Sequence, residues 1–296
     1  MRFAFLLVKH IRINSVIIGA DFKALSRAIF IQILLLGEET IMEIKGRVGF
    51  VTGGASGLGA ATVEMLHKNG GKVMIADFNE NGAKALAERL GAGAAYCVVD
   101  VTKTDQVQAG IAKTMEIFGA IDILVNCAGT GWAMKTVAKN GPHDLDIFRK
   151  IIEINLIGTF DALRLGAFHM QNNTPNEDNE RGVIINTASV AAFEGQIGQV
   201  AYSASKAGVV GMTLTIARDL ARTGIRICTI APGLFDTPLL AALPQETKDS
   251  LGKQVPFPDR LGKPTEYARM VQSIIENPYV NGETIRLDGA IRMAPK

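Results

Sequence analysis

The chain has 296 residues, of which 48% are hydrophobic and 20% are charged. This length suits one large α/β domain or two small ones, and it allows a large apolar core. A net charge of only +2 excludes nucleic-acid or anionic-membrane binding that is driven by bulk charge.

The cysteine content indicates free thiols. The three cysteines are too few and too scattered for a disulfide framework or a zinc site. They are Cys97, Cys127 and Cys228. Each lies in or beside an apolar run, so we expect buried thiols in a reducing compartment. No residues show the spacing of metal ligands, and we expect no metal.

Residues 1–41 differ in composition from the rest of the chain. They are apolar, with arginines and lysines at intervals, and their longest uncharged run is too short to span a bilayer, which needs roughly 20 residues. We interpret them as an N-terminal extension outside the core domain, with translation from Met42 as one explanation. A mitochondrial presequence is one alternative, because acidic residues are scarce before Glu38, and a structural arm is another. We therefore expect a cytoplasmic protein, or a matrix protein if this segment is a presequence.

From residue 45 onward, strands and helices alternate. The expected strands are Arg47–Thr52, Lys72–Ala76, Ala95–Val99, Ile121–Val125, Val183–Ala188, Ile225–Ile230 and Thr284–Leu287. The expected helical regions are Gly57–Asn69, Asn81–Leu90, Thr104–Phe118, His143–Met170, Val200–Thr223, Pro238–Gln254 and Pro264–Glu276. Near-continuous apolar strands with helical crossovers predict a parallel sheet covered on both faces. We therefore expect a single α/β domain over residues 42–296, a three-layer, doubly wound Rossmann-type sheet of seven strands.

A glycine-rich turn, TGGASGLG (52–59), follows the first strand and opens the first helix. Such glycines let the backbone approach a pyrophosphate, and the helix N-terminus supplies N–H donors. The strand–turn–helix context predicts a dinucleotide site. We expect contacts from Gly53, Ser56, Gly57, Leu58 and Gly59.

A carboxylate, Asp77, ends the second expected strand, 18 residues after Gly59. Such a carboxylate accepts hydrogen bonds from adenosine ribose hydroxyls and repels a 2′-phosphate. The turn contains no lysine or arginine to bind that phosphate, so the sequence favours NAD over NADP. After the third strand, Asp100 and its neighbour Val101 are candidates for an adenine contact, although Asp100 also suits the N-cap of a short turn.

Further candidates for cofactor contacts follow two later strands. Small residues after the fourth strand leave room for the cofactor, and a Pro-Gly pair after the sixth strand is expected to shape the nicotinamide pocket. Thr237 is expected either to bond the carboxamide or to cap the helix that starts at Pro238. Besides Thr237, these candidates are Asn126, Ala128, Gly129, Pro232 and Gly233.

The stretch from Gly182 to Lys206 carries the predicted chemistry. An apolar strand leads to Ser189, and Tyr202 and Lys206 share one face of the following helix. A tyrosine with an ordinary pKa of about 10 is too weak a base at pH 7. We expect Lys206 and the positive nicotinamide ring to lower that pKa, so that Tyr202 acts as base and acid. Ser189 is expected to hold the substrate oxygen.

These motifs together resemble the short-chain dehydrogenases/reductases. The resemblance runs from about Glu43 to the end and rests on TGGASGLG, NCAG (126–129), INLIG (154–158), Ser189 and YSASK (202–206). It implies catalytic roles for Asn155, Ser189, Tyr202 and Lys206, with Lys206 also binding the nicotinamide ribose. We expect Asn155 to interrupt its helix and to hold a water. Gln196, in the loop between Ser189 and Tyr202, is expected either to touch a substrate carbonyl or to be a plain loop residue.

Within this family, segments 182–199, 230–240, 254–264 and 281–293 are most similar to NAD-dependent members that interconvert 3-hydroxyacyl-CoA and 3-oxoacyl-CoA. The resemblance therefore implies an acyl-CoA or similar secondary alcohol as the small-molecule substrate, and a homotetramer. Segment 130–146, at the expected substrate entrance, matches only loosely. The alternatives are a 3-oxoacyl-carrier-protein reductase, which Asp77 disfavours, a hydroxysteroid dehydrogenase, and a non-enzymatic scaffold or RNA-processing subunit. We expect no nucleic-acid or membrane partner.

Overall fold

The computed structural model describes residues 42–241 and 244–295. The expectations for residues 1–41 therefore lie outside the described residues. Within the described ranges no helix has the length and apolar character needed to cross a membrane.

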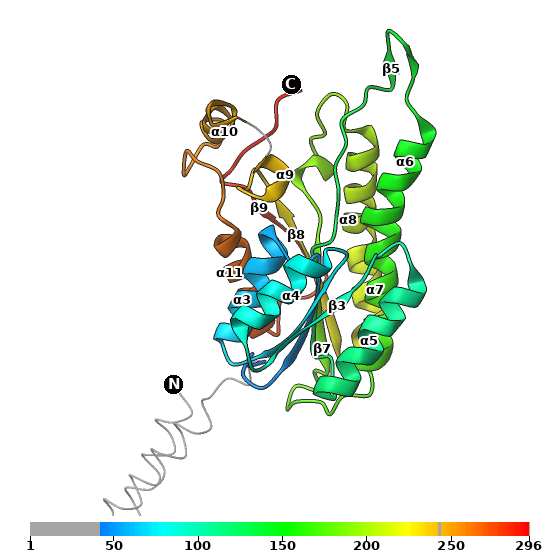
Figure 1. Cartoon of the computed structure of the whole chain (residues 1–296), viewed down its shortest axis with the longest axis vertical. Helices are drawn as coiled ribbons and strands as arrows, with labels where there is room; N and C mark the ends of the chain where they lie inside the picture. The colour runs from blue at the N-terminus through cyan, green and yellow to red at the C-terminus, as the bar shows by residue number, and fades with distance from the viewer. Residues whose placement is uncertain (1–41, 242–243, 296) are drawn as a thin grey trace, which may run out of the picture. The chain divides into compact units, whose positions relative to one another are not determined.

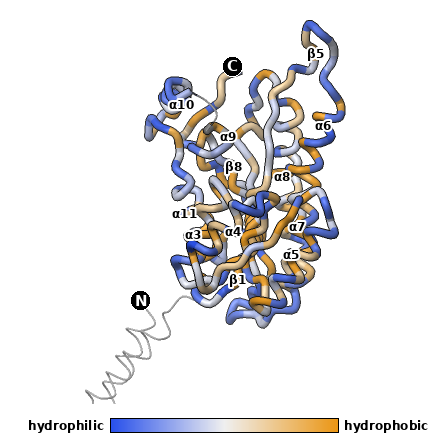
Figure 2. The backbone as a smooth tube through the Cα atoms, in the orientation of Figure 1, coloured by the Kyte–Doolittle hydropathy of each residue, from blue (hydrophilic) through white to orange (hydrophobic). Residues whose placement is uncertain are grey.

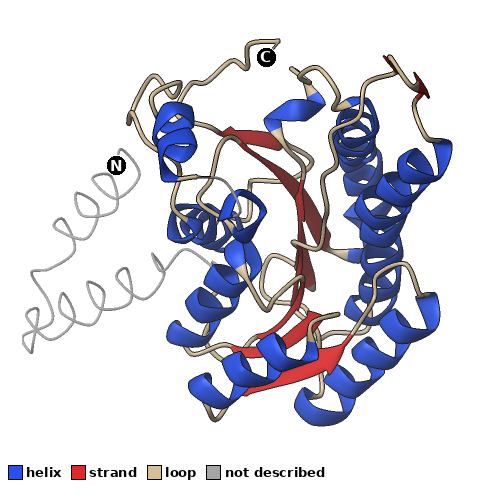
Figure 3. Cartoon of the chain, turned by 45° about the horizontal axis from the view of Figure 1, so that its top comes forward, coloured by secondary structure: helices blue, strands red, loops and turns tan. Residues whose placement is uncertain are grey.

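The centre of the fold is a seven-stranded sheet, as the sequence predicted (Figure 3). The strand order is β3-β2-β1-β4-β7-β8-β9, and every pair in the sheet is parallel. The order reverses direction beside β1, which is the signature of a doubly wound sheet. The strands are β1 (Val48–Thr52), β2 (Lys72–Asp77), β3 (Ala94–Val98), β4 (Ile123–Asn126), β7 (Gly182–Thr187), β8 (Ile225–Pro232) and β9 (Thr284–Leu287).

Helices cover both faces of this sheet (Figure 1). The bounds are α3 (Gly57–Lys68), α4 (Glu80–Leu90), α5 (Thr104–Phe118), α6 (Leu145–Ile152), α7 (Gly158–Met170), α8 (Val200–Leu220), α9 (Pro238–Ala241), α10 (Gln245–Gly252) and α11 (Pro264–Glu276). Helices α3, α4 and α11 pack on one face, and α5, α7 and α8 on the other.

Continuous apolar runs explain why the central strands are buried on both sides. Every residue of β1, β4, β7 and β8 is buried, whereas the edge strands β3 and β9 are mostly half-buried. Side chains from alternate positions of the strands enter two separate hydrophobic clusters, one under each helical layer. Figure 2 shows the apolar strands inside and the polar helix faces outside.

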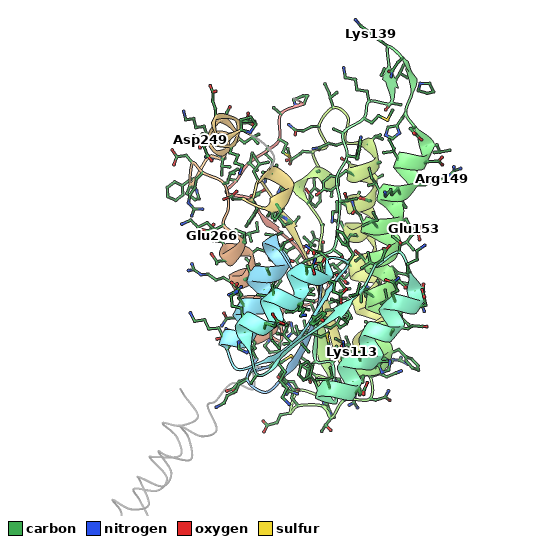
Figure 4. The ribbon with its side chains drawn as sticks, in the orientation of Figure 1. Lys113, Lys139, Arg149, Glu153, Asp249 and Glu266 are labelled. Carbon is green, nitrogen blue, oxygen red and sulfur yellow. The ribbon has the colours of Figure 1, made fainter. Side chains whose placement is uncertain are left out.

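One feature of the fold was not predicted, and a second was predicted only as an interruption of a helix at Asn155. A two-stranded hairpin, β5 (Val137–Ala138) with β6 (Gly141–Pro142), projects beyond the carboxyl end of the sheet, with Lys139 at its tip (Figure 4). The expected helical region His143–Met170 begins at Leu145 and contains a π-helical turn, Glu153–Ile157, between α6 and α7. Local hydrophobic periodicity does not report either feature, because each is short.

The polar segment 171–181 folds back onto the sheet through a buried ion pair. Arg226 of β8 donates to Glu180 at 2.7 Å, and both side chains are over nine-tenths buried. Arg226 also donates to four carbonyl oxygens at and after the end of α11, at 2.7 to 3.2 Å. The guanidinium thus satisfies the last carbonyls of that helix and ties three segments together.

Replacing Arg226 with methionine should therefore destabilise the protein by about 3–5 kcal/mol, because it leaves the buried Glu180 carboxylate without its counter-ion. Urea unfolding followed by circular dichroism measures this loss. The double variant Glu180→Leu/Arg226→Met should recover part of the loss, since no uncompensated charge remains. Equal unfolding free energies for wild type and Arg226→Met would contradict the assignment.

Candidate active site

The predicted site residues gather at the carboxyl end of the parallel strands. Asp77 ends β2, Asn126 ends β4, and Ser189 follows β7 by two residues. Helix α8 carries Tyr202 and Lys206. Because the carboxyl ends of parallel strands meet at one sheet edge, residues from distant parts of the sequence meet at this edge, where doubly wound folds bind ligands.

The glycine-rich turn forms a close-packed cradle. A Cβ on Gly59 would lie 2.1 Å from the Gly53 carbonyl oxygen, and one on Gly53 would lie 2.7 Å from the Ala128 nitrogen. Gly53 and Gly57 have φ values of +62° and +52°, in the left-handed region that glycine tolerates. Side chains at these positions would distort the turn that a pyrophosphate must approach.

The N-terminus of α3 is open to an anion. Ser56 occupies the N-cap, its side chain makes no capping hydrogen bond, and the first turn holds no acidic residue. The first N–H groups of a helix lack intrahelical partners and carry a partial positive charge. This arrangement fits the diphosphate of a dinucleotide, as the sequence predicted.

Asp77 is fixed against the glycine-rich turn. One carboxylate oxygen accepts the Ala55 N–H at 2.9 Å, and the other accepts the Asn79 N–H at 2.9 Å. The second bond is an Asx turn, so Asp77 orders its own loop as well as facing the cradle. The carboxylate is therefore held in place before any ribose arrives.

Asp100 takes up the turn role that the sequence left open. Its Oδ1 accepts both the Thr102 N–H, at 3.0 Å, and the Thr102 hydroxyl, at 2.8 Å. Its neighbour Val101 is buried, and a Cβ on Gly158 would lie 2.8 Å from the Val101 side chain. The predicted adenine contact of this segment stays a prediction.

Of the residues at and after the end of β4, Asn126 and Ala128 hydrogen-bond to neighbouring strands, whereas Gly129 leaves space beside Lys206. The side-chain oxygen of Asn126 accepts from the Thr52 hydroxyl at 3.2 Å, and its amide donates to Asn186 at 2.9 Å, so it joins three strand ends. The Ala128 N–H donates to Thr52 Oγ1 at 3.3 Å. At Gly129 a Cβ would lie 3.5 Å from Lys206 Nζ, so glycine keeps the approach to that ammonium clear.

Lys206 is buried at the centre of the site, with 4% of its surface exposed. Its Nζ donates to the Thr187 carbonyl oxygen at 2.8 Å. Burial lowers the pKa of Lys206 to about 8, although the nearby Cys127 opposes that shift. Among the described residues Thr187 supplies its one acceptor, which leaves two N–H donors for ribose hydroxyls.

Tyr202 lies beside Ser189 and Lys206. Burial raises the pKa of Tyr202, and a hydrogen bond with the Ser189 hydroxyl opposes that rise. Lys206 Nζ lies 5.8 Å from the centroid of the Tyr202 ring. The expected lowering of the Tyr202 pKa by Lys206 and the nicotinamide ring together stays a prediction. Ser189 Oγ accepts the Ala191 N–H at 3.1 Å, which leaves its proton free to donate. The protein alone thus holds Tyr202 as a neutral phenol.

Asn155 sits in the π-helical turn, which is the interruption that the sequence predicted. Its side-chain oxygen accepts the Thr130 N–H at 2.8 Å, and its amide donates to the Thr130 carbonyl at 2.9 Å and to Ser205 Oγ at 3.0 Å. Asn155 therefore fixes the segment after Gly129 against α8. Its predicted role in holding a water stays a prediction.

Two polar residues behind the site were missed from the sequence. Thr187 Oγ1 donates to the Asn126 carbonyl at 2.6 Å, so the Tyr267 hydroxyl, 2.7 Å away, must donate to it. Tyr267 belongs to α11 and is fully buried. The pair orients the end of β7, whose Thr187 carbonyl holds Lys206. Thr187 could have been found from its position just before Ser189, whereas Tyr267 has no local signal.

The remaining predicted residues border the site. A Cβ on Gly233, which follows Pro232 at the end of β8, would lie 2.9 Å from the Asp288 backbone. The Thr237 side chain lies 3.6 Å from the Cβ position of Gly57, so α9 starts beside the glycine-rich turn. Gln196 donates its amide to the Ala294 carbonyl at 3.1 Å. The predicted contacts of Thr237 with a carboxamide and of Gln196 with a substrate stay predictions.

A comparison with known families matches this arrangement to one of them. The short chain dehydrogenase family matches residues 47–248, which include the glycine-rich turn, Asp77 and the Ser189–Tyr202–Lys206 group. The chain belongs to the short-chain dehydrogenase family. It is an oxidoreductase.

Individual relatives of this dehydrogenase are similar over most of the chain. A 3-hydroxyacyl-CoA dehydrogenase type-2 of Drosophila melanogaster is 57% identical over 85% of this chain and 100% of its own length. The Homo sapiens protein of the same name is 55% identical over 85% and 97%. A crystal structure of 3-hydroxyacyl-CoA dehydrogenase type-2 from Mycobacterium avium, 43% identical, superposes with a TM-score of 0.82 over 85% of this chain and 98% of that one.

The buried lysine makes the stability of this dehydrogenase depend on pH. Below pH 8 both the folded and the unfolded chain hold the Lys206 proton, whereas between about pH 8 and 10.4 only the unfolded chain does. The wild type should therefore gain about 2–3 kcal/mol relative to Lys206→Met between pH 7 and pH 10. Urea unfolding at both pH values measures the double difference. The matched control Lys72→Met, at an exposed lysine, should show no such gain, and an equal change in both variants would contradict the burial.

Proposed function

We propose that this protein oxidises the secondary alcohol of a 3-hydroxyacyl-CoA to the 3-oxoacyl-CoA, reversibly, with NAD. The observation that carries the proposal is the 57% identity to a 3-hydroxyacyl-CoA dehydrogenase type-2 over that protein's whole length, joined to an intact Ser189–Tyr202–Lys206 group. Those relatives are named for this activity, and the side chains needed for it are present here.

The choice of NAD rests on Asp77. The residue is 5% exposed, and two backbone N–H groups fix its carboxylate beside the turn that would hold the diphosphate. A 2′-phosphate placed there would meet a negative charge, and residues 52–59 offer no lysine or arginine to neutralise it. The turn at Gly53–Gly59 and the N–H groups of α3 would hold the diphosphate, and Lys206 would hold the nicotinamide ribose.

Ser189, Tyr202 and Lys206 have different roles in the proposed proton transfer. Bound NAD supplies the hydride acceptor. Ser189, whose hydroxyl bonds with Tyr202 in the protein alone, would donate a hydrogen bond to the substrate oxygen and hold that oxygen beside Tyr202. Tyr202 must lose its proton before it can accept one from the alcohol, and in the protein alone burial opposes that loss. Positive charge around the phenol, from Lys206 and the cofactor, offsets this cost, so binding and ionisation are coupled.

A substrate panel with NAD tests the proposal. We expect NADH formation from 3-hydroxyacyl-CoA esters, with kcat/KM varying with acyl length and with α-methyl branching. The control is the same panel with NADP, which should give much lower rates. A wild-type protein that oxidises only steroids, or nothing in the panel, would overturn the proposed substrate class.

The reductase alternative ranks lower for two reasons. A 3-oxoacyl-[acyl-carrier-protein] reductase of Thermotoga maritima is 34% identical over 84% of this chain, well below the identity to the type-2 dehydrogenases. Asp77 also disfavours NADPH, the cofactor that the reductase reading implies. A large preference for NADPH in steady-state kinetics would reverse this ranking.

We also propose a homotetramer. In support, helix α7 and the π-helical turn before it carry three large apolar side chains that remain 44% to 64% exposed, namely Ile157, Phe160 and Phe168. Exposed apolar groups on one helix favour association with a second copy. Light scattering of the purified protein measures the copy number, and a monomer would contradict this proposal.

A further inference from the structure

The segment between Ser189 and Tyr202 is hydrogen-bonded to parts of the chain that lie outside the candidate active site. We call residues 190–199 the substrate loop, because they connect the residue that would hold the substrate oxygen to the helix that carries the base. We call residues 289–295 the tail. The tail has no helix or strand, and it lies at the carboxyl end of the sheet (Figure 1). Irregular chain ends are poorly ordered unless something ties them down.

Glu194 is the centre of the fastening. Its carboxylate accepts two bonds from the Arg286 guanidinium of β9, at 2.8 and 3.1 Å, in a bidentate arrangement. One of its oxygens also accepts the Met293 N–H of the tail at 3.1 Å. These bonds lower the pKa of Glu194, with Arg286 the largest cause. One carboxylate thus joins the loop, the edge strand and the tail.

Further contacts fix the Arg286 side chain in the position from which it binds the Glu194 carboxylate. It donates to Asp288 at 2.7 Å and to the Ile291 carbonyl at 3.0 Å, and it lies 5.3 Å from the centre of the Phe193 ring. Its side chain is mostly buried, which strengthens the ion pair relative to a surface pair. The guanidinium therefore contacts the loop in two ways, through the ion pair with Glu194 and through its position over the Phe193 ring.

Two further bonds join the loop to the end of the tail. The Gln196 amide donates to the Ala294 carbonyl at 3.1 Å, and the Ile197 N–H donates to the Pro295 carbonyl at 3.0 Å. On its other side the loop accepts the Met134 N–H at Gly198, 2.8 Å away, from the segment that leads into the β5–β6 hairpin. The loop is thus held between the tail and the 130–134 segment.

We propose that Glu194 is a positioning residue that fastens the substrate loop to the tail, and that the tail thereby helps to determine which alcohol reaches Ser189 and Tyr202. None of the hydrogen bonds described above joins the substrate loop to the glycine-rich turn. We therefore expect the bonds of Glu194 to affect binding of the alcohol and not binding of the cofactor. The identity of the alcohol rests on the proposed function, whereas the fastening does not.

The test compares Glu194→Gln with Glu64→Gln. Both glutamates pair with an arginine, but Glu64 pairs with Arg89 between α3 and α4, on the surface. Glu194→Gln loses the charge-assisted bidentate contact, so the KM for the alcohol should rise about 10-fold while the KM for NAD and kcat change less than about two-fold. Glu194→Asp, which keeps the charge on a shorter side chain, should show an intermediate KM. Glu64→Gln should leave all three constants unchanged.

Amide hydrogen exchange, read by mass spectrometry, tests the fastening without any substrate. In Glu194→Gln the segments that contain Ile197 and Met293 should exchange at least about 10-fold faster, together, with no change at the glycine-rich turn. Unchanged exchange at both segments would overturn the proposal, whatever alcohol the wild type oxidises. A parallel rise in both KM values with faster exchange throughout the chain would also overturn it, because that pattern indicates general destabilisation.

Discussion

Replacing Tyr202 with phenylalanine should lower kcat by about 10³-fold or more, since general acid–base catalysis by one side chain contributes about 10²–10⁴-fold. The ring and its packing remain, so the Kd for NADH should stay within about two-fold of the wild-type value. Steady-state rates of NADH formation and fluorescence titration with NADH measure the two quantities. Tyr279→Phe, at a tyrosine that is 98% exposed, is the matched control and should be fully active.

The result separates catalysis from structure. A parallel loss of NADH affinity and of kcat would indicate that Tyr202 holds the cofactor instead of moving a proton. Retention of more than about one-tenth of the wild-type kcat would contradict the assignment of Tyr202 as base. Lys206 is expected to behave differently, because it donates to the Thr187 carbonyl and, in the proposed function, would also hold the ribose. Its loss should therefore weaken NADH binding as well as lower kcat.

Replacing Asp77 with asparagine should reduce the preference for NAD over NADP by about 100-fold, through loss of a charge-assisted bond to the ribose and loss of repulsion toward a 2′-phosphate. Asparagine keeps the size of the side chain and one acceptor for the two N–H groups that Asp77 binds. The ratio of kcat/KM with the two cofactors is the measurement.

Asp100→Asn is the control for the cofactor experiment. Asp100 follows β3 and is expected near the adenine, which both cofactors share, so its replacement should change the two kcat/KM values by the same factor. An Asp77→Asn variant that keeps the wild-type ratio would show that the preference arises elsewhere. The decisive quantity is the ratio of kcat/KM with NAD to kcat/KM with NADP. A less stable loop around Asp77 would lower both kcat/KM values and leave their ratio unchanged.

Most of the fold was predictable because its strands are nearly continuous apolar runs. Each residue of β7 and β8 is buried, and such runs between helices leave few alternatives to a parallel sheet. The site followed from the same logic, since Asp77, Asn126 and Ser189 stand at or just after strand ends. These positions come together in any doubly wound sheet, so their proximity needed no knowledge of side-chain packing.

The parts that were missed depend on contacts between distant segments. Tyr267 reaches Thr187 across 80 residues, and Arg286 reaches Glu194 across 92. Neither contact can be predicted from the local pattern of polar and apolar residues. The burial that raises the pKa of Tyr202 in the protein alone also depends on packing from several elements, whereas the spacing of Tyr202 and Lys206 is visible in the sequence.

Gln196 shows a limit of a different kind. Its place between Ser189 and Tyr202 predicted either a substrate contact or a plain loop residue, and in the structure its amide donates to the Ala294 carbonyl of the tail. The sequence located the loop correctly and could not show which way the side chain turns. The residue that the amide reaches, Ala294, follows Met293, whose N–H donates to Glu194.

The most direct measurement is the initial rate of NADH formation when purified wild-type protein is mixed with NAD and 3-hydroxybutyryl-CoA, with Tyr202→Phe measured in parallel. We expect saturable NADH formation by the wild type and at least about a 10³-fold lower rate for the variant. No NADH from the wild type with any 3-hydroxyacyl-CoA, or equal rates for the two proteins, would contradict the account.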